Sequence, residues 1–280
     1  MNWTAPTIFI HAANRASVLK AEKLAEKTGL PLANDPLDKN PANLQNAVQA
    51  EWRLQVDNNT LQLARPDNVS VNIDFINGKA TQRVAESNFT KQPLARALGL
   101  HKLRSKDENE RQTPTVIDAT AGLGTDAWMI ASLGCSVRLL EQSPVLCALL
   151  QHAIDTAQSS TAHATVANQL ELIKTNSIDY LHDGASARAD IIYLDPMYPP
   201  ARKQALVKKG MQLLHELIGP DRNGPALLAA ALIKANYRVV VKRPKGAPEL
   251  GSSAEETKLW SGQITQVESP NTRFDVYHLG

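Results

Sequence analysis

A turn that follows an apolar strand is the first segment of the chain that could bind a ligand. Asp118 ends the apolar run, Gly122 and Gly124 lie in the turn, and a helix is expected from Thr125. Glycine lets the backbone approach a bound molecule closely because it carries no Cβ atom, and ligands of open α/β sheets bind beyond the carboxyl ends of the strands. The glycine spacing differs from the dinucleotide-binding GxGxxG pattern, and no P-loop lysine follows. A plain tight turn remains the alternative.

An acidic residue at the end of the next expected strand supports a ligand site at this turn. Glu141 ends the apolar run 137–140, about one strand–helix unit after the glycine turn. A carboxylate at that place can accept hydrogen bonds from both hydroxyls of a ribose. An ordinary exposed strand end is the alternative, and the nearby glycine turn makes the ribose-binding role the favoured interpretation.

The third segment brings an acid, a proline and an aromatic residue to the end of an apolar strand. Asp195, Pro196 and Tyr198 follow the run 191–194, and they resemble the Asp-Pro-Pro-Tyr class of motif in amino-group methyltransferases. An exocyclic amine conjugated to a base is a poor nucleophile. The aspartate and a backbone carbonyl beside the proline can accept its hydrogens and aim its lone pair, while Tyr198 can stack on the base. A rigid proline turn is the alternative.

The elements that must position these segments follow the pattern of a buried parallel sheet. From residue 114, apolar strands alternate with helical stretches, which is typical of βαβ units. We expect strands at 115–119, 136–141, 170–175 and 190–194, with helices at 125–133 and 144–157. Further along, we expect helices at about 202–218 and 225–235, and strands at 238–242 and 274–278.

The first hundred residues predict a small α+β appendage. Its expected elements are a strand at 6–13, a helix at 15–28 ended by Gly29, a hairpin of 51–56 and 60–64, and a strand at 69–76. The polar run that follows is typical of a solvated linker, although a basic loop that contacts a substrate is the alternative. The predicted organisation is an appendage over 1–100, a linker over 101–113 and an α/β domain over 114–280.

Composition sets only broad limits on function. Hydrophobic residues make up 43% of the 280 residues, which suits a globular core, and the net charge of +2 is too small to establish a nucleic-acid partner. Cys135 and Cys147 lie in apolar segments, so we expect reduced, buried thiols. The seven histidines lack metal-site spacing, and Ser143 and Ser177 lack a GxSxG elbow. With no secretory signal and no long apolar run, we expect a cytoplasmic protein without a membrane partner or a metal.

Longer strings across the second part of the chain are similar to one known family. They are DATAGLGTDAW, LLEQSPV, YLDPMYP, ALVKKGM, LIGPD, VVVKRP and TRFDVY, in this order across roughly residues 114–280. The chain resembles the ribosomal RNA small subunit methyltransferase J family, more loosely in its N-terminal part. The resemblance implies a Rossmann-like class I methyltransferase sheet with a small N-terminal α+β appendage, and a role in ribosome biogenesis. It also implies methyl transfer from S-adenosylmethionine to N2 of a guanine in 16S ribosomal RNA, alone or in the small ribosomal subunit.

The resemblance also implies positions for the cofactor contacts. They fall on Thr125, Asp126, Glu141, Gln142, Asn176, Ser177 and Asp195. Together with Asp118, Gly122 and Gly124, these residues make up the expected cofactor site. The expected catalytic residues are Asp195, Pro196 and Tyr198.

Two clusters of basic residues flank the amine-directed segment in the sequence. Their members are Arg202, Lys203, Lys208 and Lys209, and then Lys242, Arg243 and Lys245. Flexible cations of this kind contact phosphates, but solvated surface positions explain any one lysine equally well. Two other functions also stay open. One is methylation of DNA adenine or protein glutamine by the same kind of site, and the other is a non-catalytic nucleotide- or RNA-binding scaffold.

Overall fold

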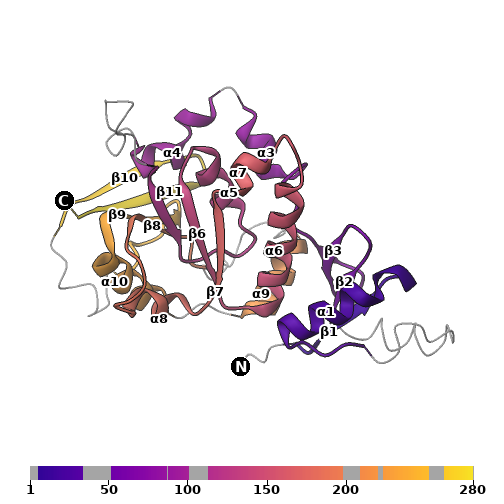
Figure 1. Ribbon diagram of the computed structural model, residues 1–280. Helices are drawn as coiled ribbons and strands as arrows, with labels where there is room; N and C mark the ends of the chain where they lie inside the picture. Colours follow the sequence, from indigo (N-terminus) through magenta and orange to yellow (C-terminus); the bar gives the residue numbers. More distant parts are fainter. Residues whose placement is uncertain are drawn as a thin grey trace. The chain divides into compact units, whose positions relative to one another are not determined.

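The computed structural model describes most of the chain and divides it into two units (Figure 1). The described residues are 6–33, 52–86, 88–100, 113–197, 209–219, 223–251 and 262–279, with the backbone alone for 209–211. The first unit comprises Met1–Asp74, Ser143–Ala153 and Pro199–Pro220, and the second comprises Phe75–Gln142, Ile154–Tyr198 and Asp221–Gly280.

The second unit is built on a seven-stranded sheet of order β10-β11-β9-β8-β5-β6-β7. Its strands are β5 (Thr115–Asp118), β6 (Ser136–Glu141), β7 (Leu170–Lys174), β8 (Ala189–Leu194), β9 (Ala235–Pro244), β10 (Ile264–Glu268) and β11 (Thr272–His278). Strands β5 to β9 pair in parallel, whereas β11 pairs antiparallel with both β9 and β10. The chain builds from β5 outward to β7 and then returns to the other side of β5 with β8. The carboxyl ends of β5 and β8 therefore flank a topological switch point, where open α/β sheets bind ligands.

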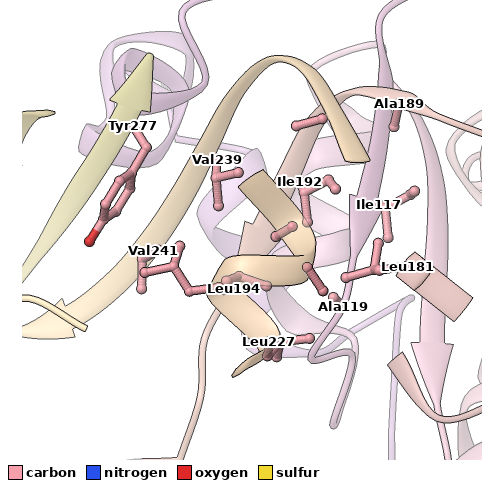
Figure 2. Close-up of a cluster of buried hydrophobic side chains, with 14 of the residues drawn as sticks. Ile117, Ala119, Leu181, Ala189, Ile192, Leu194, Leu227, Val239, Val241 and Tyr277 are labelled. Carbon is pink, nitrogen blue, oxygen red and sulfur yellow. The ribbon is translucent and has the colours of Figure 1, made fainter. Parts of the chain in front are cut away.

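Apolar side chains on the central strands form the core that fixes these strand ends. Ile117, Ile192, Val239 and Val241 are completely buried, and Figure 2 shows them in one cluster with Leu194. Helix α10 (Gly224–Lys234) packs on β8, β9 and the short helix α8 (Ser177–His182). Because runs of β-branched residues are buried on both faces of a parallel sheet, they anchor these strands in the protein interior.

The remaining helices of the second unit include α5, which begins at the glycine turn. Their bounds are α3 (Lys79–Val84), η2 (Phe89–Lys91), α4 (Pro93–Leu98), α5 (Thr125–Ser132) and α7 (Ala164–Ala167). Trp128 of α5 is buried and stacks on Phe75, with ring centroids 4.8 Å apart. Helix α4 packs on β10 and β11 and ends at Gly99, whose φ of 58° lies in the left-handed region that favours glycine. Helix α6 (Pro144–Gln158) has residues in both units.

The first unit contains a separate four-stranded sheet. Its elements are β1 (Ile8–Ala12), η1 (Arg15–Ser17), α1 (Val18–Thr28), β2 (Trp52–Val56), β3 (Leu61–Ala64), β4 (Ser70–Val71) and α9 (Lys209–Ile218). Strands β2 and β3 form the expected hairpin, and β1 joins β2 in parallel. Helix α1 packs on β1 and ends at Gly29, whose φ is 73°. Arg65 donates a hydrogen bond to Glu216 of α9 at 2.7 Å.

Most expected elements are present with shifted ends, and one expected strand is wrong. The segment 69–76 forms only the two-residue strand β4, followed by a turn over 75–77. The alternation that predicts a strand ends in Phe75, which packs against Trp128 instead of continuing the sheet. The expected parallel α/β sheet is confirmed. The predicted domain boundaries stay predictions, and α3 and α4 within 75–100 belong to the second unit.

Candidate active site

The glycine turn after β5 has the geometry of a backbone that leaves room for a ligand. Gly122 and Gly124 have φ values of 53° and 68°, a conformation in which a side chain is strained. Gly124 stands at the start of α5, where no side chain caps the first N–H groups. The nearest atom to a Cβ added at Gly122 would be the Thr120 carbonyl oxygen, at 3.7 Å. The turn is therefore open on the side of Gly122.

The acidic residue at the end of β6 reaches this turn. The Gly122 N–H donates a hydrogen bond to Glu141 Oε2 at 3.2 Å. On the other side of β6, the Thr175 N–H donates to the Glu141 carbonyl oxygen at 2.9 Å, which brings the end of β7 close. The structure thus brings together two segments that the sequence singles out separately.

Asn176 and Ser177, which follow β7, lie at the same edge of the sheet, and both make hydrogen bonds that hold the local structure. Asn176 Oδ1 accepts N–H bonds from Ile178 and Asp179 and so caps α8, while its Nδ2 donates to Gln142 Oε1 at 3.1 Å. The Ser177 hydroxyl donates to the Ala119 carbonyl oxygen at 2.7 Å. These contacts hold the polar side chains next to the glycine turn.

Asp195, at the carboxyl end of β8, belongs to a network of charged groups. The Lys242 ammonium donates to Asp195 Oδ2 at 2.8 Å and to Asp126 Oδ2 at 2.7 Å. Asp126, in the first turn of α5, also accepts a hydrogen bond from the buried Tyr193 hydroxyl at 2.6 Å. The network therefore connects the turn that follows β5 with the segment that follows β8.

Thr120 links the same two strand ends through the backbone. Its hydroxyl accepts a hydrogen bond from the Asp195 N–H at 2.6 Å and lies 3.3 Å from Asp118 Oδ1, to which it donates. The Thr120 N–H also donates to Asp118 Oδ1 at 3.0 Å. Thr120 was not predicted as a site residue; its position two residues after the strand-ending acid was the available signal.

Burial and charge shift the pKa values of this network. Burial raises the pKa of Asp118 to about 7, helped by the charges of Asp126 and Asp195 and opposed by the hydrogen bonds from Thr120. Burial also raises the pKa of Tyr193, which keeps it a neutral donor to Asp126. Burial alone would lower the pKa of Lys242, but the two carboxylates outweigh it and raise that pKa. Lys242 is therefore a cation throughout the physiological pH range.

The structure gathers most of the expected site residues at the ends of β5, β6, β7 and β8. Thr125 is exposed, and in the described part of the chain its side chain accepts and donates no hydrogen bond. Pro196 is buried directly after Asp195, and Tyr198 lies outside the described residues. No group of three or more histidine, cysteine, aspartate or glutamate side chains that could hold a metal occurs among the described residues.

The second basic cluster does not form one cationic surface. Lys242 is engaged by two carboxylates, and Arg243 is buried, where its guanidinium donates to the Pro248 carbonyl oxygen at 2.6 Å. Lys245 is exposed and pairs with Glu268 at 3.0 Å. In the first cluster, Arg202, Lys203 and Lys208 lie outside the described residues, as does the side chain of Lys209.

Comparisons with known proteins agree with this fold and site. A family model described as "Putative SAM-dependent methyltransferase" matches residues 39–279. Proteins named ribosomal RNA small subunit methyltransferase J are 39% identical in Nitrosococcus oceani (92% of each chain) and 36% identical in Pseudomonas aeruginosa (98% of this chain and 95% of the relative). The crystal structure of an S-adenosylmethionine-dependent methyltransferase from Neisseria gonorrhoeae superposes with a TM-score of 0.68 and 27% identity, covering 97% of this chain and 95% of that one.

The switch point, the glycine turn and these matches define a class of protein. The chain is an S-adenosylmethionine-dependent methyltransferase with a Rossmann-like class I fold. Within that class, it belongs to the ribosomal RNA small subunit methyltransferase J family. The expected fold, enzyme class and cofactor are confirmed, and neither alternative function gains support. No described helix has the length and apolar character needed to cross a membrane.

Proposed function

We propose that this enzyme methylates the exocyclic N2 of a guanine in 16S ribosomal RNA, in the free RNA or in the small ribosomal subunit. The observation that carries the proposal is the Asp195 carboxylate, which is fixed at the carboxyl end of β8 beside the glycine turn. The name that the relatives share supports the RNA substrate. Such a substrate also supports a place in the cytoplasm.

The glycine turn and the acidic residues around it suit S-adenosylmethionine. When bound, this cofactor supplies a methyl group on a sulfonium, already activated for transfer. We propose that Glu141 accepts hydrogen bonds from the ribose hydroxyls and that Gly122 and Gly124 allow close backbone approach. The other proposed contacts are Asp118, Thr125, Asp126, Gln142, Asn176, Ser177 and Asp195.

The charge of the site also suits a cationic cofactor. Among the described residues at these strand ends, Asp118, Asp126, Glu141 and Asp195 are acidic, against two ammonium groups. Lys242 contacts Asp126 and Asp195, and Lys174 ends β7 opposite Glu141. The excess of negative charge attracts a sulfonium and an α-ammonium, since opposite charges attract strongly where water is partly excluded.

Asp195 would orient the target amine and then help to remove its proton. Within the described part of the chain, Asp195 Oδ2 accepts the Lys242 hydrogen bond and Oδ1 accepts none, so Oδ1 remains for the amine. A neutral aromatic amine is too weak an acid for a carboxylate to ionise beforehand, so the proton leaves during or after transfer. We propose that the carbonyl beside Pro196 accepts the second amine hydrogen and that Tyr198 stacks on the base. Alignment and a proton acceptor suffice for this reaction, so it requires no metal.

Single-turnover methylation of small-subunit RNA, with the modified nucleotide mapped by mass spectrometry, tests the proposal. The wild-type enzyme should modify one guanine at N2. Asp195→Ala should lose at least about a hundredfold in rate, as expected for a group that orients the acceptor and its proton, and should lose less in cofactor affinity. Glu141→Ala should show the opposite pattern, with cofactor affinity about tenfold or more weaker by calorimetry.

Glu171→Ala provides the matched control for Glu141, because Glu171 is an exposed acid on β7 that pairs with Arg138. It should leave both the rate and the cofactor affinity near the wild-type values. A wild-type enzyme that methylates DNA or protein but not this RNA would contradict the proposed substrate. A near-native rate for Asp195→Ala would contradict the proposed catalytic residue.

A further inference from the structure

Lys242 lies between Asp195, which follows β8, and Asp126, in the first turn of α5. Leu194 of β8 lies opposite Val241 of β9, so Asp195, directly after β8, and Lys242 of β9 are the next residues along the two neighbouring parallel segments. The Lys242 ammonium also reaches Asp126 in the first turn of α5. Its side chain is 27% exposed, which leaves most of it packed within the protein.

We propose that Lys242 is a positioning residue for methyl transfer, whose ammonium keeps the Asp195 side chain a carboxylate and holds one of its oxygens so that the other can receive the target amine. This inference rests on the proposed function of Asp195. It assigns Lys242 to the reaction centre, and so replaces the phosphate contact that the sequence allows for this lysine.

The positive charge of Lys242 favours the ionised form of Asp195. Among the described residues, the titratable groups around Asp195 are Asp118 on β5, Asp126 on α5, Tyr193 on β8 and Lys242 on β9. Partial burial and the charge of Asp126 raise the pKa of Asp195, whose side chain is 40% exposed, and Lys242 opposes both effects. Tyr193 donates its hydrogen bond to Asp126 and gives Asp195 no such support. Without Lys242, Asp126 and Asp195 would be two neighbouring acids, and one of them would hold a proton at higher pH.

The contacts behind Lys242 are rigid enough for a positioning role. Asp126 is held by the Tyr193 hydroxyl, and Tyr193 is fully buried in β8. The backbone of Asp195 is held by Thr120. Lys242 therefore joins two anchored carboxylates. Its ion pair with Asp195 restricts the rotation of the Asp195 side chain, which the backbone contact leaves free.

The test compares Lys242→Met with wild type in single-turnover methylation of small-subunit RNA between about pH 5 and 9. We expect a rate at neutral pH that is lower by about tenfold or more. The acid limb of the rate profile should move to higher pH by about one to three pH units, because Asp195 loses the cation that keeps it ionised. RNA affinity and its salt dependence should stay within about threefold of wild type, since no phosphate contact is lost.

Lys242→Gln separates charge from hydrogen bonding and covers the case in which Lys242→Met does not fold. Its amide can still donate to both carboxylates, but the acid limb should move as in Lys242→Met. Lys245→Met is the matched control, because Lys245 lies just beyond the same strand in an exposed ion pair with Glu268. This control should keep the wild-type pH profile.

An unchanged pH profile in both Lys242 variants would overturn the inference while leaving the proposed function intact. Weaker RNA binding with a smaller salt dependence would also overturn it, because it would identify Lys242 as a phosphate contact. A wild-type enzyme that does not methylate the RNA would instead refute the proposed function itself.

Discussion

At the end of β5, the Asp118 carboxyl is almost completely buried, and burial raises its pKa from 3.8 to about 7. The folded protein therefore keeps this proton over a pH range in which the unfolded chain has already lost it. The free energy of unfolding should fall as pH rises from about 4 to about 7, because ionisation of Asp118 then favours the unfolded chain. The total change from this one group is at most about 4 kcal/mol.

Asp118→Asn should remove this part of the pH dependence. The amide is neutral at every pH and keeps an oxygen that can accept the Thr120 N–H. We expect the variant to resemble wild type near pH 5 and to exceed its free energy of unfolding by roughly 1–4 kcal/mol near pH 8. Urea unfolding at both pH values measures this. Asp179→Asn, at an exposed position on α8, is the control, and an equal pH dependence in wild type and Asp118→Asn would refute the prediction.

The positions of the candidate site residues were predictable where these residues end strands. Asp118, Glu141 and Asp195 each follow an apolar run, and parallel strands bring their carboxyl ends to one edge. The role of Lys242 was not predictable, because it depends on the register between β8 and β9, which are separated by some 40 residues of chain. From the sequence alone, Lys242 is one more lysine in a basic run.

At the scale of elements, the join between α4 and the sheet depends on one glycine. Gly99 ends α4 with a φ of 58°, and a Cβ added there would overlap the guanidinium of Arg238 on β9. Arg238 is buried and donates to the Ala97 carbonyl oxygen at 3.2 Å. It thus supplies a hydrogen bond to one of the carbonyl groups that the last turn of the helix leaves without a partner in the helix. Space for this guanidinium exists because residue 99 has no side chain.

Gly99→Ala should therefore destabilise the second unit more than a comparable change at an open glycine. Gly246→Ala is the matched control, since Gly246 also has a positive φ but no atom lies within 4 Å of an added Cβ. Both changes incur backbone strain of about 1–2 kcal/mol, and Gly99→Ala should lose about 1–3 kcal/mol more because the buried arginine must move. Chemical unfolding of both variants measures the difference, and equal losses would show that Arg238 adapts without cost.

The elements that escaped prediction have weak sequence patterns. Strand β10 has mostly exposed side chains at the edge of the sheet, so it lacks the apolar run that indicates a buried strand. Helices α3, α4, α7 and α8 have only four to six residues, too few to show a helical period. The long elements of the parallel sheet were predictable because their apolar runs are buried on both faces.

At the scale of the whole molecule, the net charge is only +2, although the reaction centre is acidic and the RNA substrate is a polyanion. The described centre has an excess of carboxylates, so cations elsewhere must supply the attraction for RNA. RNA affinity should fall by about tenfold or more between 50 and 200 mM salt, because phosphate contacts release counterions. Binding titrations at several salt concentrations measure this dependence, and an affinity that does not change with salt would contradict it.

We expect the cations of the first basic cluster to supply the attraction for RNA. This prediction rests on the sequence alone. Charge reversal of Lys208 and Lys209 should lower RNA affinity and leave cofactor affinity unchanged. The same reversal of Lys23 and Lys27, exposed on α1, is the control for net charge. Equal losses in both pairs would show that total charge, rather than the first cluster, determines binding.

The place of β11 in the sheet has a consequence for how the enzyme is made. Although β11 follows β10 in the chain, it lies between β10 and β9 in the sheet. During synthesis on the ribosome, the edge of β9 therefore has no strand partner until residue 278 has been added, and β10 has nothing to pair with. Open edges of apolar strands invite aggregation. A nascent chain that stalls before Thr272 should thus be a substrate for chaperones, because the edge of β9 stays unpaired until β11 is available.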